Sequence, residues 1–178
     1  MANRSYLYSV DNLPTDGQIP RPVRGISEHN ARIPLAHLLL VGRGTTVAQS
    51  LIWNARVAVA GDFAGGLDLL TRLLRAMVPD EPPERDWYLA DTQKIIDFLA
   101  GEERRGRYFF MEAGELLAPG TPAEEQVHTI VEHRVPEAVA QAETALAAPK
   151  GPIMAALRDD FEDHFESFYS DTLYFSFQ

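Results

Sequence analysis

The sequence predicts a helix-rich α+β fold that forms a single domain over residues 1–178, with a few short strands. The chain has 178 residues, enough for one hydrophobic core of ordinary size. Hydrophobic residues make up 46% of the chain and aromatic residues 10%, which is typical of a globular protein rather than a disordered one. Segments with the helical spacing of apolar residues outnumber the short segments with strand character.

The N-terminal part of the chain is expected to contain one strand and two short helices. Residues 5–10 alternate polar and large side chains, which indicates a β-strand. Residues 11–24 hold three prolines and are therefore expected to form a loop. Pro34 precedes an apolar run at 35–40, as a proline does in the first turn of a helix. We expect a further short helix at 47–54.

The middle of the chain contains the clearest helix signal. Residues 56–60 are mostly apolar and fit either a strand or the end of the preceding helix. Asp62 is a typical N-cap for a helix over 63–77, where apolar residues repeat at helical spacing. The prolines and acids of 79–84 interrupt this pattern and are the best candidate for an internal linker. A second helix is expected at 91–100, because a glycine follows it.

The next segment has one strand signal and one strong helix start. Residues 108–111 are short, aromatic and bounded by glycines, which favours a strand. Thr121 is followed by proline and then glutamate, a pattern typical of a helix start. This helix is expected to run to about residue 135. Pro136 then either kinks it or begins a new helix that continues to residue 146.

The C-terminal segment, residues 152–178, is acidic and aromatic, and its last helix is expected to begin near Pro152. Within residues 155–178, seven aromatic side chains and six acids accompany a single base, Arg158. Wound as one helix, residues 153–168 place the aromatics on one side and most acids on the other. A strand is possible at 172–177. The six acids are Asp159, Asp160, Glu162, Asp163, Glu166 and Asp171.

This acidic face has three interpretations. It is the solvated side of a helix that packs through its aromatic residues, or a docking surface for a basic protein partner. In the second case the six acids form the partner-binding site and Tyr169 is an aromatic anchor. A metal site is the third interpretation, and it is disfavoured because a hard cation requires six or more oxygen ligands in a closed shell.

Composition and charge exclude several functional classes. Acids outnumber bases 26 to 16, which argues against nucleic-acid binding because that affinity depends on Lys and Arg. The absence of cysteine excludes disulfides and thiolate metal sites. The N-terminal residues do not resemble a signal peptide. The longest apolar stretch, at 33–41, is too short to span a bilayer. We therefore expect a cytoplasmic protein that does not associate with membranes.

No catalytic, metal or cofactor motif stands out in the sequence. Glu125, His128 and Glu132 share a helix face, which is more simply a solvated face than a metal site. His37 and His164 lie on apolar stripes, where a hydrogen-bonded core histidine is the usual explanation. The glycine-rich stretches lack the spacing of a phosphate-binding loop. We expect no catalytic residues, no metal and no cofactor.

Three short segments carry a resemblance to known proteins. They are the opening Met-Ala-Asn-Arg-Ser-Tyr-Leu-Tyr, the segment Arg24-Gly25-Ile26-Ser27-Glu28 and the segment Ala60-Gly61-Asp62-Phe63. Together they resemble a family of uncharacterised bacterial proteins. In type rather than in motif, a small acidic chain without cysteine also resembles bacterial immunity proteins, which bind a co-encoded toxin and occlude its active site. This second resemblance implies a basic toxin as the partner.

Three functional hypotheses follow. The first is an immunity protein, a module without enzymatic activity that binds and inhibits a cognate toxin. The alternative is an enzyme or small-ligand-binding protein of unrecognised type, with a pocket near Arg24, Ser27, Glu28 and His29. The third is a subunit of a homo-oligomer whose aromatic C-terminus packs against its own copy, and the sequence does not predict an oligomeric state.

Overall fold

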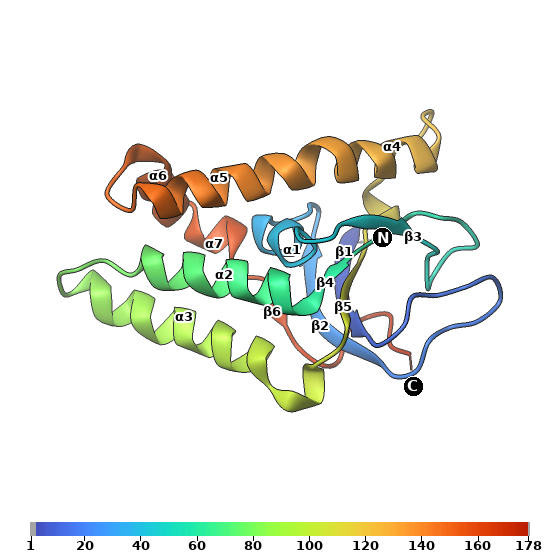
Figure 1. The fold of residues 1–178 in the computed structure, drawn as a ribbon, viewed down its shortest axis with the longest axis horizontal. Helices are drawn as coiled ribbons and strands as arrows, with labels where there is room; N and C mark the ends of the chain where they lie inside the picture. The colour runs from blue at the N-terminus through green and yellow to red at the C-terminus, as the bar shows by residue number, and fades with distance from the viewer. Residues whose placement is uncertain (1–2, 178) are drawn as a thin grey trace.

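The fold is built on one six-stranded antiparallel sheet (Figure 1), seen in a computed structural model that describes residues 3–177. The strands are ordered β3-β4-β5-β1-β2-β6, so the N-terminal strand β1 lies between β2 and β5 near the centre. Their bounds are β1 Arg4–Val10, β2 Val23–Asn30, β3 Thr46–Ala48, β4 Ala58–Asp62, β5 Tyr108–Glu112 and β6 Phe168–Tyr169. The helix-rich α+β prediction is therefore confirmed.

The helices cover one face of this sheet. Figure 1 shows α2 and α3 running side by side below α1, with the long α4–α5 rod above them. Their bounds are α1 Leu35–Leu40, α2 Phe63–Met77, α3 Glu84–Ala100, α4 Ala123–Thr129, α5 Val135–Ala147, α6 Pro152–Asp159 and α7 Phe161–His164. Short 3-10 turns occur at Glu102–Arg104 and Gly114–Leu116, and one π-helical segment at Ile130–Arg134.

The larger hydrophobic core lies between the sheet and these helices. Leu7, Phe109 and Met111 contribute from the central strands, because alternate residues of a strand point to the same face. Phe63, the first residue of α2, stacks on Phe109 with ring centroids 4.2 Å apart. The helix predicted at 63–77 has these bounds, and its N-cap is confirmed by a 2.7 Å hydrogen bond from the Gly65 N–H to the Asp62 carboxylate.

A second, smaller core lies on the opposite face of the sheet. Tyr6 and Tyr8 of β1 point to this side and are buried beneath the C-terminal residues of the described chain. The Tyr8 hydroxyl donates a 2.7 Å hydrogen bond to the carbonyl of Phe175, whose ring packs edge-on against Tyr6. Residues 172–177 form no strand, so that expectation is wrong, but their side chains cover the sheet.

The helix predicted at 47–54 is also wrong. Residues 46–48 form the edge strand β3, and the chain then bends around the buried carboxylate of Glu112. That carboxylate accepts hydrogen bonds from the Ser50 hydroxyl at 2.9 Å and the Leu51 N–H at 2.6 Å. Glu112, which is distant in sequence, therefore accepts the hydrogen bond of a backbone N–H that in a helix would have been donated to a carbonyl of the preceding turn.

Two helix boundaries differ from the prediction. Helix α3 begins at Glu84, seven residues before the expected start, so the expected linker at 79–84 is a short connection over 78–83 between α2 and α3. Thr121 makes no capping hydrogen bond; instead the Gln126 side chain bonds to the backbone of Ala118 and Thr121. The N-terminus of α4 is thus organised by a residue inside the helix.

Pro136 neither breaks nor sharply separates the helices around it. Helices α4 and α5 form one continuous rod in Figure 1, joined by the π-helical segment Ile130–Arg134. Proline has no N–H to donate to the carbonyl four residues earlier. The wider π-helical turn lies just before Pro136. A regular α-helix at this position would leave one carbonyl without its N–H donor.

The single helix expected over 153–168 is wrong as well. Helix α6 ends at Asp159, Asp160 leaves the helical conformation, and α7 ends at His164. Phe168 then enters the edge strand β6 and is 58% exposed instead of lying on a buried helix face. The side chains of Leu157, Phe161 and Phe165 are buried as the pattern predicted, because each short helix still turns its apolar side inward.

Candidate functional site: an acidic surface around Trp87

The structure distributes the predicted partner-binding residues over three places. Asp159, Asp160, Glu162 and Asp163 gather where α6 meets α7, and all four are exposed. Glu166 and Tyr169 line a separate cavity beside β6. Asp171 is exposed on the C-terminal segment, where its backbone carbonyl lies against Gly25 of β2. The seven residues therefore do not form one continuous face.

The first group surrounds a tryptophan that the sequence analysis did not single out. Trp87 of α3 is 45% exposed, and its ring packs edge-on against Tyr88 and Phe161 at 4.8 and 5.5 Å. Together they line a surface depression of about 240 Å³. We call this the acidic surface: Trp87, Tyr88, Arg158, Asp159, Asp160, Phe161, Glu162 and Asp163.

The break between α6 and α7 is what creates this arrangement. Because the chain turns at Asp160, with φ −99° and ψ 21°, Phe161 enters the core while its neighbours stay outside. The Tyr88 hydroxyl donates a 2.8 Å hydrogen bond to the carbonyl of Arg158, which ties α3 to the end of α6. Burial, followed by the charge of Glu84, raises the pKa of Tyr88 above its ordinary value. Trp87 and Tyr88 are thus held in place against the acids.

Two of the four carboxylates on the acidic surface have no ion pair among residues 3–177. Asp163 pairs with Arg32 at 2.7 Å, and Asp160 lies 4.0 Å from His164. Within residues 3–177, neither Asp159 nor Glu162 forms an ion pair. The Arg158 side chain instead donates to the carbonyls at the end of α2, with Nε 2.7 Å from the oxygen of Met77. Carboxylates therefore remain available to an incoming positive charge.

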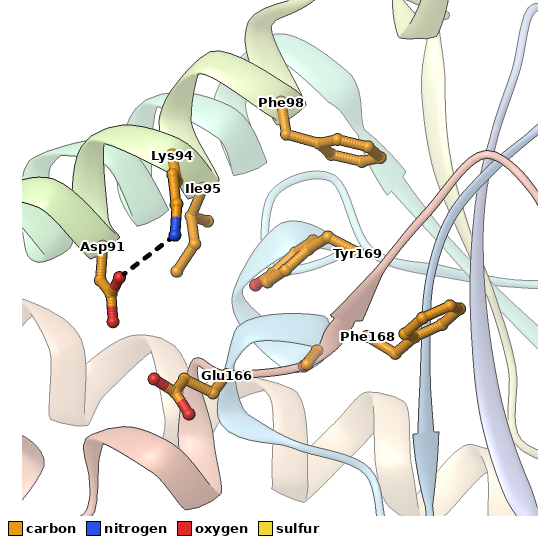
Figure 2. A pocket seen from close by; sticks show the side chains of 8 residues that line it. Asp91, Lys94, Ile95, Phe98, Glu166, Phe168 and Tyr169 are labelled. Atoms are coloured by element: carbon orange, nitrogen blue, oxygen red, sulfur yellow. Dashed lines mark ion pairs between the residues drawn. The ribbon is translucent and has the colours of Figure 1, made fainter.

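A larger cavity lies between α3 and β6 (Figure 2), and we call it the α3–β6 cavity. Its volume is about 600 Å³. It is lined by Asp91, Lys94, Ile95, Phe98, Glu166, Ser167, Phe168 and Tyr169. The Lys94 ammonium lies 3.8 Å from the Asp91 carboxylate. Burial, then the nearby Glu162 and Asp91, raises the pKa of Glu166.

Of the residues proposed as a ligand pocket, which all belong to β2, Glu28 and His29 line one cavity of about 350 Å³, whereas Arg24 lines a different one. Arg24 pairs with Asp11 at 3.2 Å, on one side of the strand. Ser27 is fully buried, and its hydroxyl lies 2.9 Å from Nε2 of His37 beneath the helices. Glu28 pairs with Arg4 at 3.5 Å. Their side chains are already engaged with three different parts of the molecule.

Within residues 3–177 there is neither a metal-binding cluster of side chains nor a helix that could cross a membrane. No three or more histidines, aspartates or glutamates among residues 3–177 are grouped so that they could hold a metal ion. His128 and the acids that share its helix face are exposed. None of the described helices is both long enough and apolar enough to cross a membrane.

Several of the site residues missed by sequence reasoning belong to α3. Trp87, Asp91, Ile95 and Phe98 repeat at intervals of four, four and three residues, which places them on one helix face. This stripe connects the acidic surface to the α3–β6 cavity. The sequence analysis did not predict this stripe because it placed the start of the helix at residue 91, after Trp87. With a start at residue 84, the spacing of the four residues indicates a single helix face.

Comparison with known proteins gives one match. A family model described as "Domain of unknown function (DUF7822)" matches residues 11–152. No curated protein and no solved structure matches the chain. The matched region contains all of α3 and ends at the first residue of α6, so the acids of the acidic surface lie after it.

Proposed function

This chain belongs to the family described as "Domain of unknown function (DUF7822)", and we propose that it is a protein-binding module rather than an enzyme. Its partner is a basic protein that docks on the acidic surface. The observation that carries the proposal is Trp87, a large aromatic side chain that is 45% exposed beside four exposed carboxylates.

Trp87 and its acidic neighbours have the chemistry of an interface centre. Tryptophan is among the residues most enriched at binding hot spots, because its ring buries a large area with little loss of conformational freedom. An arginine or lysine of the partner can stack on the indole face while its charge meets a carboxylate. Asp159 and Glu162, which have no ion pair within residues 3–177, are the carboxylates best placed for this role.

The partner class that fits best is a bacterial toxin acting on nucleic acids or nucleotides. Such toxins have basic active-site clefts, and an acidic surface with a central aromatic side chain is complementary to them. The chain would then act as an immunity protein in the bacterial cytoplasm and inhibit the toxin stoichiometrically. The alternative of a pocket near residues 24–29 has less support, because Arg24, Ser27 and Glu28 are engaged elsewhere.

The test uses the whole chain as bait, co-expressed with the products of the adjacent genes. Partner capture is compared for the wild type, for Trp87→Ala and for the charge reversal Asp159→Lys with Glu162→Lys. We expect a basic partner that is released as NaCl increases over roughly 0.05–0.5 M. With the purified partner, each variant should weaken the dissociation constant by about tenfold or more.

The matched control reverses two exposed acids on another helix, Glu125→Lys with Glu132→Lys. It changes the net charge by the same amount as Asp159→Lys with Glu162→Lys. A difference in binding between the two variants therefore reports on the acidic surface and not on the overall charge of the molecule. Equal binding by all variants, or the absence of any basic partner, would contradict the proposal. A partner whose enzymatic activity is inhibited by the wild type, but not by Trp87→Ala, would support the immunity function specifically.

A further inference from the structure

We infer that the α3–β6 cavity is a binding site for a small organic cation, a molecule with a flat aromatic body and one protonated amine. The geometry of the cavity, its two carboxylates and its unpaired hydroxyl groups point to this class of ligand. The inference does not rest on the proposed docking of a protein, because it concerns the opposite end of the α3 stripe from Trp87.

The walls of the cavity suit an aromatic body. Ile95 and Phe98 contribute from α3, while Phe168 and Tyr169 contribute from β6 on the other side (Figure 2). The rings of Phe98 and Tyr169 are 5.9 Å apart. A volume of about 600 Å³ falls within the usual size of small-molecule sites, roughly 300–1,000 Å³.

The polar end of the cavity favours a positive charge. Asp91 and Glu166 approach each other from two different elements, and Figure 2 shows both at the same end of the cavity. Their repulsion contributes to the raised pKa of Glu166, after burial and Glu162. A cation between them would relieve this repulsion. Lys94 already pairs with Asp91 at 3.8 Å and opposes the rise in the pKa of Glu166, but its side chain is 82% exposed, so a ligand ammonium competes only with an ion pair that water screens.

Two hydroxyl groups on the cavity wall lack partners. The Ser167 Oγ and the Tyr169 hydroxyl oxygen are buried, and neither makes a hydrogen bond of good geometry within residues 3–177, although the neighbouring Ser167 opposes the rise that burial causes in the pKa of Tyr169. In Figure 2 the Tyr169 hydroxyl points toward the end of the cavity where Asp91 and Glu166 lie. Buried polar groups are normally hydrogen-bonded, so this pair marks a place where a further polar group is expected. An ammonium at this end of the cavity can donate hydrogen bonds to both carboxylates.

The experiment measures binding of three probes that share an indole body and differ only in charge. Tryptamine carries an ammonium, indole-3-ethanol a hydroxyl and indole-3-acetate a carboxylate. We expect tryptamine to bind with one site per chain by titration calorimetry, and about tenfold more tightly than indole-3-ethanol. Indole-3-acetate should bind more weakly than either. Equal binding of the three probes, or binding of none, would overturn the inference.

Variants then locate the binding site. Glu166→Gln removes one carboxylate from an exposed residue and should abolish the preference for tryptamine over indole-3-ethanol. Tyr169→Phe keeps the ring and should weaken tryptamine several-fold. The control, Asp97→Asn, neutralises an exposed acid of α3 that does not line the cavity, and it should bind like the wild type. If Glu166→Gln keeps the wild-type preference, the amine does not sit in this cavity.

Discussion

Two buried polar side chains, Glu112 and His37, show how single residues hold this molecule together. Glu112 is fully buried, and its carboxylate organises the backbone that follows β3 through Ser50 and Leu51. His37 is equally buried, with Nδ1 3.2 Å from the Ser5 hydroxyl and Nε2 2.9 Å from the Ser27 hydroxyl. The prediction of a hydrogen-bonded core histidine is confirmed for His37, whereas the side chain of His164 remains 31% exposed.

Glu112 should make stability fall as pH rises through a defined window. Burial raises its pKa from 4.5 to about 7, although hydrogen bonds from Leu51 and Ser50 oppose the change. Between pH 4.5 and 7 the folded state keeps a proton that the unfolded state has lost. Stability therefore decreases with pH in this window and is constant, for this group, above and below it. Glu112→Gln should remove that dependence, a difference of up to about 3 kcal/mol.

The measurement is the free energy of unfolding in urea, for the wild type and Glu112→Gln, from pH 4.5 to 8. The difference between the two proteins is compared because His37 acts in the opposite direction. Burial lowers the pKa of His37 from 6.5 to about 3, so its contribution makes stability rise with pH between those values. As the pH rises from 4.5 to about 7, we expect the free energy of unfolding of Glu112→Gln to increase relative to that of the wild type. A pH-independent difference would show that Glu112 is ionised throughout.

At the scale of elements, α1 and α2 pack closely against each other at Gly66. A Cβ atom on Gly66 would lie 1.9 Å from the carbonyl oxygen of Leu40, so the two helices meet where α2 has no side chain. Gly66→Ala should therefore destabilise the protein by about 2 kcal/mol or more, since backbone must move to admit the methyl group. Thermal or urea unfolding of the variant measures this.

The adjacent Gly65→Ala is the matched control. Its Cβ would lie 2.9 Å from the Cβ of Arg43 and 3.0 Å from the capping oxygen of Asp62, contacts with side chains and not with backbone, and alanine has the higher helix propensity. We therefore expect Gly65→Ala to cost clearly less stability than Gly66→Ala. Equal losses in both variants would mean that α1 and α2 are not in such close contact.

Helices α2 and α3 show which features of an element the local sequence pattern predicts and which it does not. The helix over 63–77 was predicted at its observed bounds, because Asp62 caps it and leucines repeat along its buried face. The start of α3 was misplaced, because the acids and aromatics of 84–90 have no clear amphipathic pattern by themselves. Trp87 and Tyr88 are positioned by contact with Phe161, which follows them by seventy-four and seventy-three residues. No local rule identifies such a contact.

At the scale of the whole molecule, the C-terminal segment completes the second core. Leu173 is 5% exposed and packs in this core with Tyr6, Tyr8 and Phe110 of the sheet. Leu173→Ala should destabilise the protein by about 2–4 kcal/mol, because it removes a buried side chain and leaves a cavity. The exposed neighbour Thr172→Ala should have little effect. If both variants unfold like the wild type, the C-terminal segment does not seal this face in solution.

The sequence by itself determined the composition of the fold: a helix-rich α+β chain, its central strands and the capped helix α2. These depend on neighbours along the chain, through alternation, helical spacing and capping. Only the tertiary structure decided that the acids divide into separate places, that Trp87 lies among four of them, and that α3 and β6 enclose a cavity. These features depend on segments distant in sequence, and the contacts between them are selected by packing rather than by local preference.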